Sequence, residues 1–240
     1  MGKFKQTKRI LYLGGKDGER LYLNDLKFKM ADGTRVRVKK TMIPGKNSKD
    51  LIARSKGRYA LLGLFSRPGY RVLDFPCGSG YVADFLKEFG IKYEGKECDK
   101  ITVEYAKRMY GGSNTHFSFG DLCSSKLKIK YYDTIGCIEG LEHIDKEYQE
   151  PLITELYSAL KPGGTLIISS PENTEGVSGS SKVNPYHKWE LTKNDFLNLL
   201  YTKFKSEEVV IVSYKVVLSY GAQLTTCFFG ICHKEYEKEK

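Results

Sequence analysis

The sequence predicts an α/β fold: a doubly wound, seven-stranded sheet with an antiparallel last strand, preceded by a small N-terminal β-meander and a helix. Two observations predict this class. From Tyr70 onward, short apolar runs alternate with helical stretches, which is the pattern of βαβ units. Before Tyr70, short alternating runs are separated by Gly-containing breaks, as in a meander. We therefore expect an extension at 1–67 and a main domain at 68–240.

The N-terminal extension is predicted to contain four short strands and one helix. Short runs of apolar or alternating residues, expected to form strands, lie at 10–13, 20–23, 26–30 and 35–39. Asp17-Gly18 and Asp32-Gly33 lie in breaks between these runs, and Asp-Gly is a strong hairpin signal. Ser48 is suited to cap a helix across Asp50 to Phe65, which Pro68-Gly69 ends.

The main domain is predicted to alternate strands with helices. The expected strands are 71–75, 93–97, 115–119, 132–138, 165–169, 208–214 and 224–233. The expected helices are 81–89, 101–110, 147–160 and 192–204. A short link joins the last two strands, and a link of that length fits only an antiparallel pair. The sheet is therefore expected to end in a hairpin.

Basic residues are concentrated at the N-terminus. The formal net charge is +10, and residues 1–71 hold 19 Lys and Arg against 5 Asp and Glu, whereas the remaining 169 residues hold 20 against 24. Concentrated positive charge attracts phosphate-rich partners, although solvated basic faces are common on ordinary enzymes. Nucleic acid is therefore a candidate partner of the extension.

Other features exclude whole classes of protein. No stretch approaches the roughly 18 apolar residues of a membrane-spanning helix, and the first residues lack the apolar core of a leader peptide. The six cysteines are scattered and form no C-x-x-C pair, so neither a disulfide framework nor a zinc knuckle is indicated. These observations predict a cytoplasmic protein without membrane contact.

A Gly-rich loop follows the first strand of the main domain. The small residues Cys77-Gly78-Ser79-Gly80 would let a ligand approach the backbone. Together with Ala83, the two glycines also match the dinucleotide-binding fingerprint, so this loop fits an NAD-dependent enzyme equally well. Glu97 ends the second strand, where a carboxylate can bind both ribose hydroxyls. Asp99 competes for this role, but we favour Glu97 because Asp99 already falls in the next loop.

Further segments complete an ordered set. They are Phe119-Gly120-Asp121-Leu122, Asp133-Thr134-Ile135, Glu139-Gly140-Leu141-Glu142-His143 and Leu160-Lys161-Pro162-Gly163-Gly164-Thr165-Leu166. Together with the Gly-rich loop, this order resembles the class I S-adenosylmethionine-dependent methyltransferases, particularly the broad group with Leu-Glu-His after strand four. The resemblance covers about residues 70–233. It implies a Rossmann-like sheet, methyltransferase activity and S-adenosylmethionine as the cofactor.

The resemblance also implies which residues bind the cofactor. Asp74 lies near the methionine amino group in this family, a contact that a nicotinamide enzyme does not need. The resemblance implies that the Asp121 carboxylate accepts a hydrogen bond from the adenine amino group and that the backbone amide of Leu122 contacts the adenine ring. Pro76 departs from the family because it replaces a glycine and has no N–H. The implied set is Asp74, Cys77, Gly78, Gly80, Glu97, Cys98, Asp121, Leu122 and Glu139.

His143, Glu142 and His187 are the candidate catalytic residues. Methyl transfer requires alignment and, for an oxygen or nitrogen acceptor, a general base. Glu142 and His143 follow strand four, while His187 lies in a loop that is Gly/Ser-rich at 176–181 and is a candidate lid. Alternatively, His143 caps a helix or supports other site residues, and His187 has a structural role.

A metal site is a further alternative. The order Glu-x-x-Glu-His at Glu139, Glu142 and His143, followed by His187, resembles the small-RNA 2′-O-methyltransferases, and these ligands suit Mg²⁺ or Mn²⁺. The same order is common in methyltransferases that need no metal, so we assign no metal ligand.

The preferred function is methyl transfer to an oxygen or nitrogen of a small molecule or sugar. This preference comes from the segment 187–192, which resembles a broad group that mostly modifies small molecules and glycans. One alternative is RNA or DNA methylation, with metal-assisted 2′-O-methylation as one form. A second alternative is a catalytically silent subunit that binds nucleic acid or protein.

Overall fold

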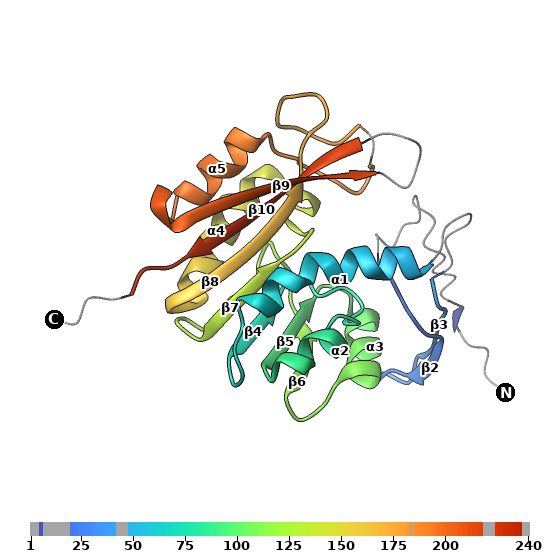
Figure 1. Ribbon diagram of the computed structural model, residues 1–240. Coiled ribbons are helices and arrows are strands. Elements are labelled where there is room, and N and C mark those ends of the chain that lie inside the picture. Colours follow the sequence, from blue (N-terminus) through green and yellow to red (C-terminus); the bar gives the residue numbers. More distant parts are fainter. Residues whose placement is uncertain (1–4, 7–19, 42–47, 183, 218–223, 237–240) are drawn as a thin grey trace.

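A seven-stranded sheet forms the centre of the protein (Figure 1). The computed structural model describes residues 5–6, 20–41, 48–182, 184–217 and 224–236. The strands are β4 (Arg71–Asp74), β5 (Lys92–Glu97), β6 (Thr115–Phe119), β7 (Tyr132–Cys137), β8 (Leu160–Pro171), β9 (Val209–Val217) and β10 (Leu224–His233). Their order is β6-β5-β4-β7-β8-β10-β9. In this sheet β10 alone runs opposite to the other six strands, which confirms the predicted fold class.

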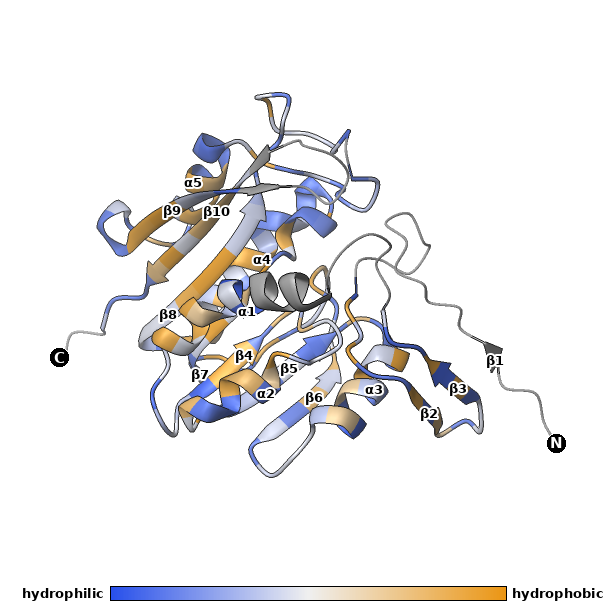
Figure 2. Cartoon of the chain, turned by 45° about the vertical axis from the view of Figure 1, so that its right-hand side comes forward, coloured by the Kyte–Doolittle hydropathy of each residue, from blue (hydrophilic) through white to orange (hydrophobic). Residues whose placement is uncertain are grey.

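Helices cover both faces of the sheet (Figures 1 and 2). The helices on one face are α1 (Ser48–Leu64), α2 (Ala83–Leu86) and α3 (Lys100–Tyr110), and those on the other are α4 (Lys146–Ala159) and α5 (Lys193–Tyr201). Asp99 caps α3 by accepting hydrogen bonds from the amides of Ile101 and Thr102 at 2.8 and 3.2 Å. Within the described ranges, no helix combines the length and the apolar character needed to cross a membrane.

Each face of the sheet has its own hydrophobic core. Leu156 of α4 and Phe196 of α5 pack with Phe228 of β10 on one face, and Leu62 of α1 and Leu86 of α2 pack on the other. Figure 2 shows hydrophobic residues along β4 and β8, which are covered on both sides. Strands buried on both faces explain why the sequence shows continuous apolar runs there instead of strict alternation.

Most element boundaries agree with the predicted ones. The strand predicted at 165–169 is longer, because β8 begins at Leu160, whose register partner is Tyr132 at the start of β7. The helix predicted at 81–89 is instead the short α2 followed by a 3₁₀ turn at Lys87–Phe89.

The N-terminal extension contains the predicted hairpin. It is formed by β2 (Leu26–Lys29) and β3 (Arg35–Val38), while β1 (Lys5–Gln6) joins β3 in parallel. The strand predicted at 20–23 is absent, because these residues have no regular secondary structure and belong to no sheet. The predicted strand at 10–13, the turn at 17–18 and the capping side chain of residue 48 lie outside the described part.

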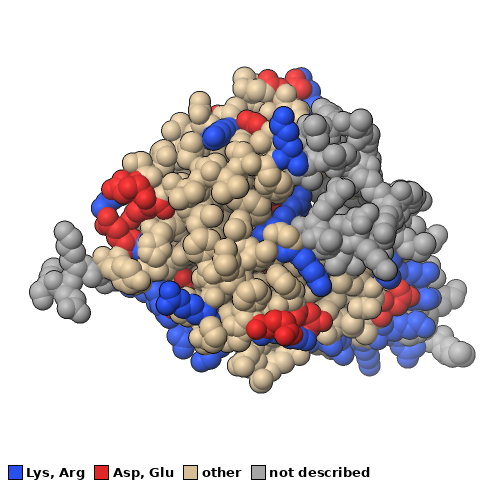
Figure 3. Space-filling view, in the orientation of Figure 1, with Lys and Arg blue, Asp and Glu red and all other residues tan. Residues whose placement is uncertain are grey.

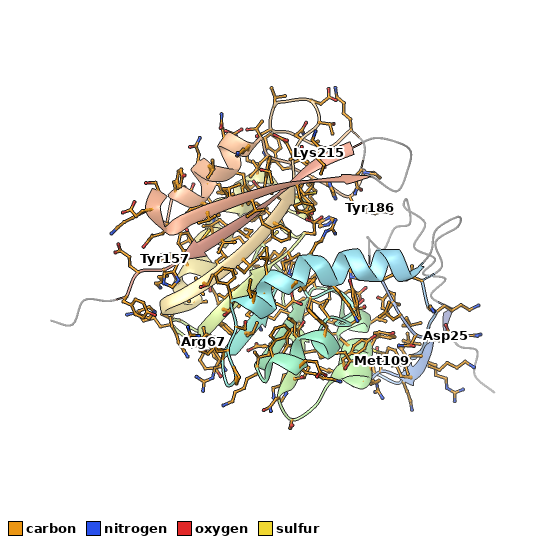
Figure 4. All side chains as sticks on the ribbon, in the orientation of Figure 1. Asp25, Arg67, Met109, Tyr157, Tyr186 and Lys215 are labelled. Carbon is orange, nitrogen blue, oxygen red and sulfur yellow. The ribbon has the colours of Figure 1, made fainter. Side chains whose placement is uncertain are left out.

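An aromatic contact anchors the hairpin to α3. The ring of Tyr22, which is almost fully buried, lies edge-on to the ring of Tyr105 with centroids 4.9 Å apart. Phe28 and Val36 of the hairpin belong to the same cluster, against which Met109 packs. Figure 4 shows Met109 next to the hairpin. The alternation at 20–23 therefore reflects packing on a helix and not strand pairing.

Removing Phe228 should weaken the α5 side of the core. Its ring stacks on Phe196 with centroids 5.7 Å apart and is 1% exposed. We expect Phe228→Ala to lower the free energy of unfolding by about 3–5 kcal/mol. Urea unfolding measures this, with Ile129→Ala as the control because Ile129 is 74% exposed. Equal effects of the two substitutions would contradict the assigned core.

Candidate cofactor and acceptor site

A Gly-rich loop joins β4 to α2 at the centre of the sheet. Gly78 and Gly80 have φ values of +53° and +79°, conformations that other residues rarely adopt. A Cβ atom on Gly80 would lie 2.6 Å from the ring of Phe117, so packing alone requires glycine there. A Cβ atom on Gly78 would meet nothing within 4 Å, so a ligand has room to approach the backbone at Gly78.

Two amides of this loop are engaged inside the protein. The Cys77 amide donates to the carbonyl oxygen of Lys96 at 2.9 Å, and the Gly80 amide donates to that of Cys77 at 3.0 Å. Pro76 has no amide hydrogen to offer. Cys77 and Gly80 therefore brace the loop, whereas Gly78 borders open space.

Asp74 ends β4 and is fully buried. Its Oδ2 accepts a hydrogen bond from the Tyr93 hydroxyl at 2.6 Å, while Oδ1 has no hydrogen-bond partner among the described residues. Burial raises the pKa of Asp74 from 3.8 to about 7, against the opposing effect of the Tyr93 and Tyr59 hydroxyls. A buried carboxylate oxygen without a partner is costly, so Asp74 is suited to accept a hydrogen bond from a cationic group of a ligand.

Glu97 ends β5 and is 2% exposed. Its Oε1 accepts hydrogen bonds from Arg20 Nη2 at 2.6 Å and from the Asp99 amide at 3.0 Å. The side chain of Asp99 is occupied as the cap of α3. Of the two carboxylates proposed for ribose binding, Glu97 is therefore the one whose side chain is not used by a helix.

The next candidates follow β5 and β6. Asp121 Oδ1 accepts a hydrogen bond from the Cys123 amide at 2.9 Å, which fixes a turn beside the half-buried Leu122. Cys98 is exposed, and its thiol donates to Glu97 at 3.3 Å. These residues lie at the carboxyl ends of neighbouring strands, on the same edge of the sheet as the Gly-rich loop.

Glu139 follows β7 in a strained conformation. Its φ is +53°, which is uncommon for a residue other than glycine and typical of functional positions. The hydroxyl of Ser169 accepts from the Glu139 amide at 2.9 Å and donates to Oε1 at 3.0 Å. Arg58 Nη2 of α1 lies 3.4 Å from Oε2. Both carboxylate oxygens of Glu139 are thus held in place.

Glu142, His143 and His187 lie together. Glu142 and His143 belong to the 3₁₀ turn η2 (Leu141–His143), and the two imidazole rings are edge-to-face with centroids 5.0 Å apart. The loop that carries His187 is attached to η2 because the carbonyl oxygen of Glu142 accepts from the amides of Lys188 and Trp189 at 2.8 and 3.2 Å. The predicted catalytic residues therefore form one group.

Both histidines are oriented through Nδ1. His143 Nδ1 lies 3.1 Å from the carbonyl oxygen of Tyr186, which Figure 4 labels, and His187 Nδ1 lies 2.5 Å from Glu190 Oε1. Glu190 is 3% exposed, so this pair is shielded from water. Such bonds fix the orientation of an imidazole ring.

Glu142 is the most deeply buried member of the group. It is 1% exposed, and neither carboxylate oxygen has a hydrogen-bond partner among the residues that the structure describes. Burial and the charge of Glu139 raise the pKa of Glu142 to about 8, although His187 acts in the opposite direction. Glu142 is therefore suited to hold a proton or a cation.

Sequence reasoning missed several supporting residues. Arg20 and Arg58 come from the extension and from α1, and they pair with Glu97 and Glu139. No motif marked either arginine, because both partners lie far away along the chain. Glu190 lies three residues after His187, and that spacing was a signal that could have found it.

Comparison with known protein families identifies the family of this chain. A family model described as a methyltransferase domain matches residues 47–204. The chain belongs to this methyltransferase domain family. S-Adenosylmethionine is the cofactor that this membership implies, which agrees with the expected cofactor.

Curated relatives match this methyltransferase domain over part of their length. A probable S-adenosylmethionine-dependent methyltransferase of Mycolicibacterium smegmatis is 27% identical over 135 residues, covering 56% of this chain and 51% of that protein. A ubiquinone biosynthesis O-methyltransferase of Xanthomonas campestris is 30% identical over 112 residues, covering 45% of each chain. The chain thus spans about half the length of these relatives.

Solved structures share the fold. A SAM-dependent methyltransferase from Methanosarcina mazei superposes with a TM-score of 0.60 at 16% identity, covering 75% of this chain and 99% of that one. At this identity, the likeness establishes the arrangement of strands and helices.

The residues at the edge of the sheet fit S-adenosylmethionine. The unpaired Oδ1 of Asp74 is an acceptor suited to the methionine ammonium group, and the open side of Gly78 admits a ligand to the backbone. Glu97 supplies a carboxylate at a strand end, where ribose hydroxyls are bound in this class of sheet. Asp74, Gly78 and Glu97 are therefore the residues that would hold the cofactor.

Asp74→Asn should change how stability depends on pH. The folded protein keeps the Asp74 proton up to about pH 7, whereas an ordinary aspartate loses it near 3.8. The parent therefore loses stability as pH rises between these values, because only its unfolded state releases the proton. The stability of Asp74→Asn relative to the parent should increase across this window and then level off. Urea unfolding without cofactor measures this, and a pH-independent difference would contradict it.

Proposed function

We propose that this chain transfers a methyl group from S-adenosylmethionine to an oxygen or nitrogen atom of a small molecule or sugar. The group formed by Glu142, His143 and His187, beside Glu139, carries this proposal. The cofactor supplies, when bound, a methyl group that its sulfonium already activates. The protein must then align the acceptor and remove its proton. The division into an extension at 1–67 and a domain at 68–240 remains part of the proposal.

His143 is the residue assigned to receive the proton. The carbonyl oxygen of Tyr186 can only accept, so His143 Nδ1 donates to it, and the lone pair of the neutral ring lies on Nε2. His187 instead donates from Nδ1 to Glu190, and its Nε2 lies 2.8 Å from Asn184 Nδ2, which donates to it. We therefore assign the acceptor's proton to His143 Nε2 and a positioning role to His187.

The loop at 173–191 supports this assignment. The backbone of Gly179 pairs with that of Glu190, and Asn173 Nδ2 donates to the carbonyl oxygen of Gly179 at 3.1 Å. These bonds brace the loop internally, and its Lys188 and Trp189 amides attach it to Glu142, which is 1% exposed. A closed loop excludes water from the acceptor site, and its opening would release product.

The choice of acceptor atom draws on the relatives. Several of them carry the name ubiquinone biosynthesis O-methyltransferase, which states transfer to oxygen. A phenol or sugar hydroxyl needs a base near neutral pH, which the assigned role of His143 provides. Oxygen on a small molecule is therefore the first acceptor to test.

His143→Ala should separate cofactor binding from turnover. We expect turnover to fall about 10²–10⁴-fold, because a positioned base contributes about this much. Affinity for S-adenosylhomocysteine should stay within about twofold of the parent's, whereas Asp74→Ala should weaken it about tenfold or more because an ammonium partner is lost. Calorimetry measures affinity, and release of S-adenosylhomocysteine with a panel of phenols, sugars and short RNAs measures turnover.

Lys188→Ala is the matched control for these variants. Its side chain is 51% exposed and pairs with Asp145 at the surface of the same loop. The control should match the parent in both assays. Unchanged turnover in His143→Ala with an acceptor that the parent methylates would contradict the assigned base. Cofactor binding without turnover on every acceptor would favour a catalytically silent subunit.

A second candidate function is metal-assisted methylation of an RNA 2′-hydroxyl. The ligand atoms of Glu142, His143 and His187 lie within 4.8 Å of one another, and the unpartnered carboxylate of Glu142 suits a divalent cation. Glu190 and the carbonyl oxygen of Tyr186, which hold the imidazoles at Nδ1, are the kind of partners that support metal-binding histidines. In this candidate, both histidines would ligate through Nε2, and the Asn184 amide would withdraw from His187.

The N-terminal hairpin favours the RNA form of this candidate. Lys27 lies opposite Arg37 and Lys29 lies opposite Arg35, so like charges face each other across the strands. A surface with this concentration of positive charge attracts the phosphates of a nucleic acid. Figure 3 shows Lys and Arg side chains gathered over the hairpin at the right of the view.

Titration with Mn²⁺ tests the metal candidate. With S-adenosylhomocysteine present, the parent should bind one ion, and Glu142→Gln should bind it at least about tenfold more weakly because a charged ligand is lost. Glu147→Gln on the exposed start of α4 is the control and should bind like the parent. Absence of Mn²⁺ and Mg²⁺ binding by the parent would rule out the metal candidate and leave the proposed function standing.

A further inference from the structure

The segment Arg20–Tyr22 contacts two parts of the candidate cofactor site. In the Gly-rich loop, the hydroxyl of Ser79 donates a hydrogen bond to the carbonyl oxygen of Leu21. At the end of β5, Arg20 Nη2 donates to Glu97 Oε1 at 2.6 Å. A piece of the N-terminal extension thus bridges the loop and the carboxylate that flank the cofactor.

This segment is anchored next to both contacts. The Tyr22 hydroxyl lies 2.6 Å from Thr102 Oγ1 in the first turn of α3, and its ring packs on Tyr105. The Tyr22 amide donates to Thr41 Oγ1 at 2.9 Å. Because Arg20 is only two residues away from this buried anchor, docking of the extension on α3 determines where its guanidinium lies.

The ion pair between Arg20 and Glu97 is largely buried, unlike a surface ion pair. The side chains are 20% and 3% exposed, so the carboxylate is almost completely removed from water. A carboxylate at this depth is costly unless a cation or several donors compensate it. Arg20 supplies that cation, and its removal would leave a buried charge.

The donors to Glu97 also determine how its carboxylate is oriented. Oε1 accepts from Arg20, the Asp99 amide and the Cys98 thiol, while Oε2 accepts no hydrogen bond from the residues that the structure describes. One oxygen is therefore used by the protein and the other is available to a ligand. Three donors on one oxygen restrict rotation of the carboxylate, which prepares Oε2 for a hydroxyl.

We propose that Arg20 is a positioning residue for the cofactor: it acts through Glu97, holding the carboxylate charged and oriented for the ribose hydroxyls. This inference rests on the proposed function, since ribose binding by Glu97 belongs to it. The N-terminal extension is then part of the cofactor site. Docking of the extension and binding of the cofactor are coupled, so each favours the other.

Calorimetry with two ligands tests the role of Arg20. The ligands are S-adenosylhomocysteine and its 2′,3′-dideoxyribosyl analogue, and the proteins are the parent, Arg20→Ala, Arg20→Lys and Arg67→Ala. Arg20→Ala should weaken S-adenosylhomocysteine binding about tenfold or more. Binding of the analogue should change by less than about twofold, because no ribose hydroxyl is present for Glu97 to hold.

The remaining variants serve as controls. Arg20→Lys should bind S-adenosylhomocysteine with intermediate affinity, because Lys keeps the charge but loses the planar fork of donors. Arg67→Ala removes an exposed positive charge between α1 and β4 and should bind like the parent. Adding Arg20→Ala to Glu97→Gln should weaken binding no further than Glu97→Gln alone. Thermal unfolding of each variant without ligand checks folding, and Arg20→Lys carries the test if Arg20→Ala does not fold.

The outcomes separate this inference from the proposed function. If the parent binds S-adenosylhomocysteine and Arg20→Ala binds it equally well, Arg20 has no positioning role. Tighter binding by Arg20→Ala would show that Arg20 competes with the ribose, which also overturns the inference. If Arg20→Ala loses affinity equally for S-adenosylhomocysteine and for the dideoxyribosyl analogue, the substitution disturbs the whole site and not ribose binding, and this result also overturns the inference. Failure of the parent to bind S-adenosylhomocysteine would overturn the proposed function itself.

Discussion

Strands β4 and β7 lie side by side at the centre of the sheet, and the chain leaves them toward opposite faces. α2 follows β4 on one face, and α4 follows β7 on the other. In open α/β sheets, ligands bind at the carboxyl ends of strands where the chain diverges in this way. The loops after the two strands are in close contact, because a Cβ atom on Gly140 would lie 2.4 Å from Pro76. The Gly-rich loop, Glu139 and Glu142 all depend on this one pair of strands.

Burying carboxylates at this edge costs desolvation free energy, and different groups compensate it at each position. Glu97 and Glu139 pair with Arg20 and Arg58, respectively. Asp74 accepts a hydroxyl hydrogen bond, and burial raises its pKa to about 7. Both arginines come from before β4, so part of the N-terminal basicity serves the site itself. The excess of positive charge there is therefore not evidence for nucleic acid alone.

Periodicity and motif spacing were sufficient to predict the sheet. The seven strands follow from hydrophobic runs, and the Gly-rich loop follows from residues whose backbone conformation only glycine adopts easily. The contact of Arg20 with Glu97 joins residues 77 positions apart, and no local pattern encodes it. Alternation around Tyr22 predicts a strand that the structure lacks, because a side chain that packs on a helix gives the same pattern. Sequence reasoning grouped His143 with His187, but the carboxylate of Glu190 behind His187 emerged only from the fold.

The central claim is that this edge of the sheet binds a methyl-donor cofactor. Calorimetric titration of the unmodified chain with S-adenosylhomocysteine, with NAD as the control, tests it most directly. The Gly-rich loop alone fits either ligand, whereas the unpaired oxygen of Asp74 favours a ligand with an ammonium group. We expect micromolar binding of S-adenosylhomocysteine and none of NAD. Binding of NAD, or of neither ligand, would contradict the account.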